Sequence, residues 1–182
     1  MLSPNFQPFP VLTTQRLVLR RFIDADAADL LELRSNADIM QYINRPLTKT
    51  LDDALGLIKV IDDLLAGNNG ITWCISFKNN PQFIGSIGFW RIEKDNYRAE
   101  IGYLLNPAFQ GIGIMQEAIE AVIDFGFGVM NLHSIQANVS PGNTGSIKLL
   151  ESNNFMREGY FKENHLHNGR FADTIIYSLL TK

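Results

Sequence analysis

The sequence of 182 residues contains one cysteine and no excess of basic charge. Because Cys74 has no second cysteine to pair with, an intrachain disulfide is excluded, and its place in the apolar run 71–77 predicts a small buried side chain rather than a nucleophile. The formal net charge of -3 provides no general attraction to nucleic acid or to an anionic membrane. We therefore expect no nucleic-acid partner and no membrane partner.

We also expect no signal peptide and no membrane-spanning segment. Residues 1–10 have neither the basic nor the apolar region of a signal peptide, and no apolar run approaches the roughly 20 residues needed to span a bilayer. Together with the single cysteine, this favours a cytoplasmic protein. The length favours one domain over residues 1–182. His165 and His167 stand in what reads as a polar loop without a cysteine or carboxylate partner, so we expect no metal site.

Two residue patterns alternate along the chain. Aspartates in a first turn favour a helix near 24–33, and apolar residues at helical spacing predict helices near 51–66 and 115–122, with a further helix expected over 143–152. The 51–66 helix is bounded by Thr50 and Gly67. Alternating or clustered β-branched and aromatic residues predict strands near 15–22, 71–78, 83–92, 97–105, 134–139 and 171–180. This order predicts an α+β fold: one twisted, mostly antiparallel sheet flanked by helices on both faces, with a parallel crossover near residues 106–119.

A glycine turn joins the strand expected at 97–105 to the helix that follows it. The segment 106–119 reads NPAFQGIGIMQEAI, with Gly111 and Gly113 just before the helix. Backbone amides at a helix N-terminus can converge on an anion, and the helix dipole favours negative charge there. Ile114 stands where a Walker loop needs lysine, and Gln116 where a dinucleotide fingerprint needs glycine or alanine. Taken alone, the turn is equally consistent with phosphate binding and with a plain turn.

The segment Gln110-Gly-Ile-Gly-Ile-Met115 resembles the Gln/Arg-x-x-Gly-x-Gly/Ala signature of the GCN5-related N-acetyltransferases (GNAT). Met115 departs from that signature, and Leu150 stands where many members of the superfamily carry a tyrosine that protonates the departing thiolate. Other segments are similar, in order along nearly the whole chain, to the ribosomal-protein alanine acetyltransferase (RimJ/RimL-like) branch: Arg16-Leu-Val-Leu-Arg-Arg21, Glu100-Ile-Gly-Tyr-Leu-Leu105, the pattern from Asn143 to Phe155, and Asn168-Gly-Arg-Phe-x-Asp173.

The resemblance implies an N-acetyltransferase with acetyl-CoA as cosubstrate. It implies that backbone amides of Leu104 and Leu105 stabilise the oxyanion of the reaction. It implies that Asn143 holds the pantetheine arm or the substrate, although an asparagine there also suits a helix cap. The residues implied in pyrophosphate binding are those of the turn and the helix start: Gln110, Gly111, Ile112, Gly113, Ile114 and Met115.

An acceptor amine must lose a proton before it can attack a thioester, and Glu100 is the candidate general base. A carboxylate in an apolar strand should have a raised pKa, whereas the alternative is an ion pair with Arg98 on the same strand face. Ser146 is the second catalytic candidate, as a proton donor or a hydrogen-bond partner of the cofactor. Its alternative is a hydroxyl bonded to its own helix.

The acceptor is left open by the sequence. The branch resemblance implies a protein α-amine, and a small amine such as an antibiotic or a polyamine is the alternative. Trp73 and Trp90 are expected in the core or at a dimer contact, with Trp90 as an alternative wall of the acceptor site. Two further interpretations compete: a non-catalytic acyl-CoA-binding domain, favoured by the missing tyrosine at Leu150, and an interaction module whose glycines only shape a turn. Formation of a homodimer stays open.

Overall fold

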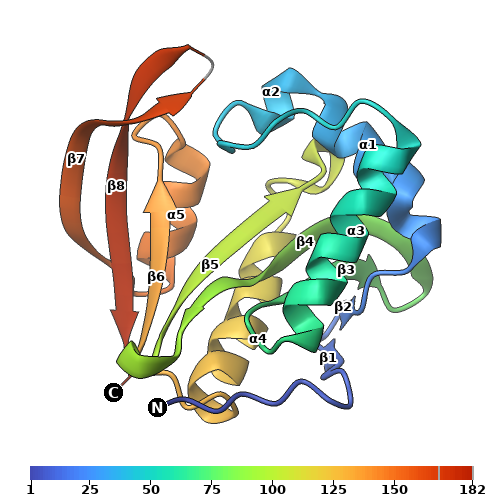
Figure 1. Cartoon of the computed structure of the whole chain (residues 1–182), viewed down its shortest axis with the longest axis horizontal. Helices are drawn as coiled ribbons and strands as arrows, with labels where there is room; N and C mark the ends of the chain where they lie inside the picture. Colours follow the sequence, from blue (N-terminus) through green and yellow to red (C-terminus); the bar gives the residue numbers. More distant parts are fainter. Residues whose placement is uncertain (168, 182) are drawn as a thin grey trace.

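Strands of the chain form one open, twisted sheet (Figure 1). The computed structural model describes residues 1–167 and 169–181, and of His167 only the backbone. Within these residues the sheet has eight strands in the order β1-β2-β3-β4-β5-β6-β8-β7. Neighbouring strands are antiparallel except β5 and β6, which are parallel. The strands are β1 (Leu12–Thr13), β2 (Leu17–Arg20), β3 (Ile71–Phe77), β4 (Asn80–Glu93), β5 (Arg98–Leu105), β6 (Ser134–Val139), β7 (Met156–His167) and β8 (Arg170–Leu180).

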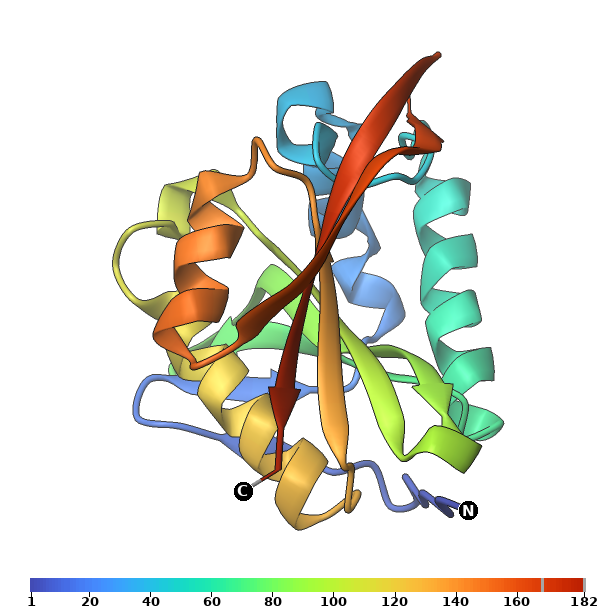
Figure 2. The same cartoon turned by 90° about the vertical axis from the view of Figure 1, so that its left-hand side faces the viewer.

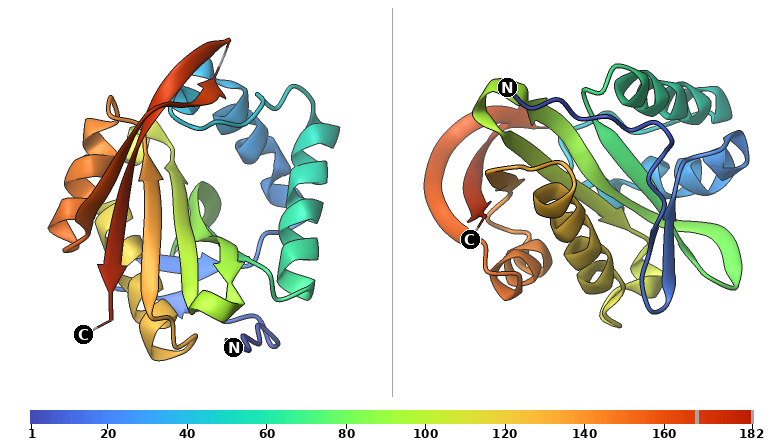
Figure 3. Two further views of the ribbon diagram at one scale, coloured as in Figure 1. Left: turned by 60° about the vertical axis from the view of Figure 1, so that its left-hand side comes forward. Right: turned by 90° about the horizontal axis from the view of Figure 1, so that it is seen from below.

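Helices cover both faces of this sheet. Seen from below, α1 and α3 lie on one face and α4 and α5 on the other (Figure 3). The predicted α+β fold is therefore confirmed, including the parallel crossover, which runs from β5 through α4 to β6. The helices are α1 (Ala27–Ser35), α2 (Ala37–Met40), α3 (Leu51–Ala66), α4 (Ile114–Gly128) and α5 (Thr144–Ser152).

Local sequence explains where α3 begins and ends. The Thr50 hydroxyl accepts from the Asp53 N–H at 3.1 Å, and the Asp53 carboxylate accepts from the Thr50 N–H at 3.0 Å. This reciprocal pair satisfies two N–H groups that would otherwise lack a partner at the start of the helix. Gly67 follows the last helical residue, Ala66, so the predicted bounds of this helix are confirmed.

The strand period sorts the side chains of β5 between two cores. Leu104 lies in the core cluster that contains residues of α1 and α3, whereas Leu105 lies in the cluster that contains residues of α4. Because successive side chains of a strand point to opposite faces, Glu100 and Gly102 share the face of Leu104. Tyr103 packs against the cluster on the α4 face. The predicted burial of Cys74 is also confirmed, and burial raises the pKa of its thiol to about 12.

Three elements escaped the sequence patterns: β1, α2 and β7. The expectation of a polar loop at His165 and His167 is wrong, because β7 pairs with β8 at His165↔Ala172 and His167↔Arg170. The apolar strand β8 provides a pairing edge on which even a polar segment becomes extended. The side chain of His167 and the whole of Asn168, which opens the closing motif, lie outside the described residues.

The described residues contain neither a cluster of metal-ligating side chains nor a membrane-spanning helix. No group of three or more His, Cys, Asp or Glu side chains is placed to hold a metal ion within 1–167 and 169–181. In the same part of the chain, each helix is too short or too polar to cross a membrane.

Candidate active site

The parallel strands β5 and β6 separate after Glu100 (Figure 1). They pair only at Arg98↔Ser134, Ala99↔Ile135 and Glu100↔Gln136. Beyond this point β5 stays with β4 as far as Leu105, while β6 stays with β8 as far as Val139. Among the described residues, no strand covers the other edge of the later half of β5, which we call the β5 edge.

The β5 edge presents particular backbone amides. The N–H of Asn106 donates to Ile84 O at 2.9 Å, so it points to β4. Hydrogen-bonded and non-hydrogen-bonded pairs alternate along an antiparallel ladder. Leu104, two residues earlier and opposite Ser86, therefore also directs its N–H to β4. The N–H of Leu105 points the other way, toward the open edge, so Leu105 is the better placed of the two predicted donors.

The glycine turn follows the end of β5 directly. Gly111 and Gly113 have φ of 74° and 79°, in the left-handed region that favours glycine. Gly113 is the N-cap of α4, whose first intrahelical bond runs from the Glu117 N–H to Gly113 O at 3.1 Å. The N–H groups of Ile114, Met115 and Gln116, between Gly113 and Glu117, face the open end of the helix. Gln110 ties the turn to the strand, since its Nε2 donates to Leu105 O at 3.3 Å.

The turn residues Gly111, Ile112 and Gly113 are exposed, whereas the first helical residues are buried. Met115, which departs from the signature, is 9% exposed and packs in the core on the α4 face, and Ile114 beside it is 1% exposed. A Cβ added to Gly111 would meet no atom within 4 Å. The Met115 side chain thus lies in the core rather than over the exposed residues of the turn, and the departure from the signature is accommodated by the core.

An ion pair that the sequence patterns did not indicate supports the turn. The Glu117 carboxylate accepts from the Arg16 Nε at 2.6 Å, from the Arg16 N–H at 2.7 Å and from the Thr14 hydroxyl. Arg16 Nη1 also donates to Ile112 O at 2.9 Å. Burial alone would raise the pKa of Glu117, but the hydrogen bonds of Thr14 and Arg16 outweigh it and lower that pKa. Arg16 therefore neutralises a carboxylate in the first turn of α4, where it would repel an anion.

Glu100 lies where the two strands part, on the α1 and α3 face. It is 8% exposed, and burial raises its pKa against the opposing influence of Arg91 and Asn138. Asn138 Nδ2 of β6 donates to Glu100 Oε1 at 2.9 Å, and Arg91 Nη1 lies 4.0 Å from Oε2. The alternative ion pair with Arg98 is wrong, because Arg98 binds Glu93 at 2.7 Å instead.

Asn143 at the N-cap of α5, Ser146 of α5 and Tyr103 of β5 belong to the other side of the site. Asn143 caps α5, since its Oδ1 accepts from the Ser146 N–H at 3.1 Å, so the helix-cap interpretation is confirmed. Burial raises the pKa of Tyr103 to about 12, and the Ser146 side chain opposes this rise. Tyr103 is a residue that the sequence patterns did not single out. Leu150, at the position of the missing tyrosine, is fully buried.

The site is thus two-sided. The amides of the turn and the side chain of Tyr103 belong to the α4 face, while Glu100 belongs to the α1 and α3 face. The open β5 edge connects them. A ligand bound at the start of α4 and an amine beside Glu100 would meet at this edge, between β5 and β6.

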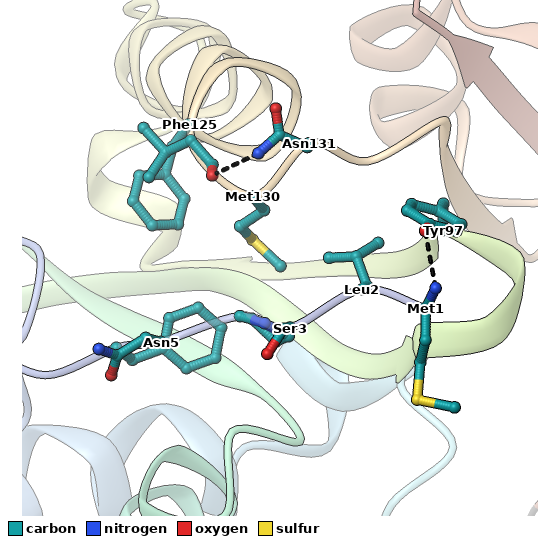
Figure 4. A pocket seen from close by; sticks show the side chains of 11 residues that line it. Met1, Leu2, Ser3, Asn5, Tyr97, Phe125, Met130 and Asn131 are labelled. Carbon is teal, nitrogen blue, oxygen red and sulfur yellow. Dashed lines mark hydrogen bonds between the residues drawn. The ribbon is translucent and has the colours of Figure 1, made fainter.

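Two hollows lie near α4. One, of about 500 Å³, borders the turn and is lined by Thr14, Arg16, Gly113, Gln116 and Glu117 among others. The other, of about 450 Å³, lies at the far end of α4, between Phe125, Met130 and the segment 1–6 (Figure 4). None of the predicted site residues lines this second hollow. It is separate from the site at the β5 edge.

Comparisons with known proteins match this geometry. The family model "Acetyltransferase (GNAT) domain" matches residues 16–156. The chain is 37% identical over 171 residues to the uncharacterized N-acetyltransferase p20 of Bacillus licheniformis, covering 94% of this chain and 96% of that protein. A GNAT-family acetyltransferase of Bacillus anthracis has a similar crystal structure, with a TM-score of 0.83 and 28% identity over 94% of this chain and 98% of that one.

Two more distant relatives have named acceptors. The ribosomal protein uS5 alanine N-acetyltransferase of Escherichia coli is 26% identical, covering 93% of this chain and 90% of its own length. The spermidine N(1)-acetyltransferase of Vibrio cholerae is 27% identical, covering 87% of this chain and 89% of its own length. With its family model, its relatives and its fold in agreement, this chain belongs to the GNAT family and is an N-acetyltransferase.

Proposed function

We propose that the protein transfers an acetyl group from acetyl-CoA to the N-terminal α-amine of a protein. The observation that carries this proposal is the open β5 edge, which has Glu100 at its start and the free N–H of Leu105 near its end. Residues 1–182 act as one catalytic domain in this proposal, because the sheet runs without interruption from β1 to β8.

The donor fits the α4 side of the edge. The amides from Gly111 to Met115 provide N–H groups and the positive end of a helix dipole for the pyrophosphate. Arg16 favours this anion further because it holds the Glu117 carboxylate. The Leu105 N–H can donate to the thioester oxygen, on which negative charge develops as the amine attacks. Asn143 retains its side-chain N–H groups for the pantetheine arm, because the helix cap uses only Oδ1.

Glu100 serves as general base from the other face. The amine nitrogen attacks the carbonyl carbon, its proton passes to the Glu100 carboxylate, and the carbon–sulfur bond breaks. The departing thiolate then takes a proton, for which Ser146 on the α5 side is the proposed donor. The raised pKa of Glu100 brings its basicity closer to that of the proton donors it must serve.

The acceptor, the location and the assembly are parts of the same proposal. A protein α-amine is supported by the relative that acetylates ribosomal protein uS5, and a polyamine by the spermidine relative. A cytoplasmic location is consistent with an acceptor made in that compartment. A sedimentation measurement of the molecular mass would decide whether the protein forms a homodimer.

An acceptor panel tests the proposal. Thiol release from acetyl-CoA is followed with short peptides that have free α-amines, with the same peptides blocked at the N-terminus, with spermidine and with aminoglycosides. We expect turnover of the free peptides and none of the blocked ones. Turnover of spermidine or aminoglycosides without turnover of any peptide would show a small-molecule enzyme. Acetyl-CoA binding without turnover of any amine would indicate a non-catalytic domain.

A further inference from the structure

Three arginines surround the exposed face of the site next to Glu100. Trp90 of β4 covers Gly102, because a Cβ added to Gly102 would lie 3.3 Å from the indole Cδ1. The guanidinium carbon of Arg91 lies 4.8 Å from the centre of the Trp90 ring, and that of Arg45, from the α2–α3 segment, lies 5.2 Å from it. Both distances are typical of cation–π contacts. The third is Arg34 of α1, which is close enough to Arg45 for the two charges to interact. We call these four residues the Trp90 cluster.

Arg34 is in an unusual position. Its Nε is buried and has no hydrogen-bond partner in the described part of the chain. Burial, followed by the charge of Arg45, lowers the pKa of Arg34. A buried donor of a charged group without a partner is costly, and a second cation nearby adds to that cost. This local arrangement would become favourable if an anion were bound there.

The carboxylates of Glu93 and Glu100 act on Arg91, and that of Glu100 also acts on Arg45, but neither forms a close ion pair with the cluster. Within the residues described, neither Arg34 nor Arg45 forms an ion pair, and Arg91 reaches Glu100 only at 4.0 Å. The charge of Arg45 also acts on Glu100, so the cluster and the base belong to one site. Arg45 is exposed and the Arg91 side chain is 59% exposed, which makes both accessible from solvent. A polyamine would be repelled here, whereas a carboxylate would be attracted.

We infer that the acceptor is a peptide with an acidic side chain at its second or third residue, bound by the Trp90 cluster. This inference rests on the proposed acetylation of a protein α-amine. The position follows from distance: Arg91 is 4.0 Å from Glu100, where the amine must lie, and one extended residue spans roughly 3.3–3.6 Å. Bidentate guanidinium–carboxylate contacts would supply the partners that Arg34 and Arg45 lack.

Matched peptides test the inference. Three peptides with the same first residue carry Asp, Asn or Lys at the second residue, and a second set carries them at the third. We expect kcat/KM for the Asp peptide to exceed that of the Asn peptide by about tenfold, mainly through KM, with the Lys peptide lower still. High salt should reduce the difference, because screening weakens exposed charge contacts.

Charge-removing variants connect the preference to the cluster. We expect Arg45→Gln and Arg91→Gln each to reduce the Asp-over-Asn ratio to threefold or less. Because both arginines also act on Glu100, this ratio, and not the turnover of one peptide, is the quantity compared with wild type. Arg34→Gln keeps a polar side chain and should also reduce the Asp-over-Asn ratio. The matched control is Arg21→Gln, since Arg21 pairs with Asp62 on the surface and should leave the ratio unchanged.

Failure of the inference can be told from failure of the proposed function. Equal kcat/KM for Asp, Asn and Lys peptides would overturn the inference and leave peptide acetylation standing. Better turnover of spermidine than of any peptide would also overturn the inference. If no amine is acetylated, the proposed function fails. Calorimetric binding of the peptides in the presence of CoA then decides the inference: equal binding of Asp and Asn peptides overturns it, and tighter binding of the Asp peptide supports it.

Discussion

Burial and a few polar partners act in opposite directions on the pKa of Glu100. Burial raises its pKa, while Arg91 and Asn138 act in the opposite direction without reversing the rise. Because the folded protein then holds its proton more tightly than the unfolded chain does, this group stabilises the fold at low pH. That contribution is lost as the pH rises from about 4.5 through the higher pKa of the folded state. A buried carboxylate thus costs stability at the pH where it would work as a base.

Glu100→Gln should separate catalysis from stability. We expect kcat with the best acceptor to fall about 10²- to 10⁴-fold, because the general base is gone. We expect the melting temperature at pH 7 to be equal or higher, because a neutral amide replaces a carboxylate whose ionisation is opposed by burial. Thiol-release kinetics and thermal melts between pH 4 and pH 8 measure both quantities.

The pH dependence provides the check on this residue. In the wild type, kcat/KM should rise with pH through a pKa above the ordinary glutamate value, and the variant should lack this limb. Full turnover of Glu100→Gln across the pH range would show that another group accepts the proton. A variant that loses activity and stability together would point to a structural role.

At the scale of elements, the turn before α4 depends on backbone that L-residues avoid. Gly113 combines a φ of 79° with an unfilled Cβ position 3.4 Å from Arg16 Nη2. It also begins the helix whose open N–H groups are proposed to bind pyrophosphate. The same glycine thus sets the direction of α4 and leaves room for the ligand.

Gly113→Ala should destabilise the fold and weaken cofactor binding. The left-handed conformation costs an L-residue roughly 1–2 kcal/mol, and each kcal/mol lowers the melting temperature of a domain of this size by about 2–4 °C. The matched control is Gly56→Ala in α3, where an added Cβ meets no atom within 4 Å. The control should stabilise by about 0.5–1 kcal/mol. Thermal melts and the KM for acetyl-CoA decide; a fully active, stable Gly113→Ala would contradict the role of the turn.

At the scale of the molecule, the site exists because two strands separate within one sheet. The β7–β8 hairpin projects at the same end of the molecule as α2 (Figures 1 and 2). On the α2 side, the Tyr42 ring approaches the β6–α5 segment, since a Cβ added to Gly142 would lie 3.3 Å from Tyr42 Cε1. Segments far apart in sequence therefore surround the open β5 edge.

Acetyl-CoA should stabilise the whole domain. A ligand that binds only the folded state at about 100 times its Kd adds roughly 2.7 kcal/mol. For a chain of this length, that corresponds to a rise of about 5–11 °C in melting temperature. Differential scanning fluorimetry with acetyl-CoA, and with adenosine as a control that lacks the pyrophosphate, measures it. Equal shifts with both ligands, or none with acetyl-CoA, would contradict binding at the α4 turn.

Much of the fold could be predicted because its signals are local. The Thr50 and Asp53 cap, the apolar spacing of α3, and the β-branched strands β3, β4 and β5 are read within a few residues each. The three missed elements β1, α2 and β7 are stabilised by neighbours instead. The strand β7 forms on the edge of β8, and its polar sequence carries no strand pattern of its own.

The features of the site also separate into those that local sequence predicts and those that depend on tertiary contacts. The sequence by itself determined the glycine turn at the start of α4 and the candidate base, because these depend on residue type and order along the chain. Only the tertiary structure decided that Leu105 rather than Leu104 offers its N–H to the open edge, and that Met115 lies in the core. It alone brought Arg45 and Arg91 together beside Trp90, with Arg34 near Arg45. Strand register and contacts between distant segments depend on how the sheet pairs, and no local pattern encodes that pairing.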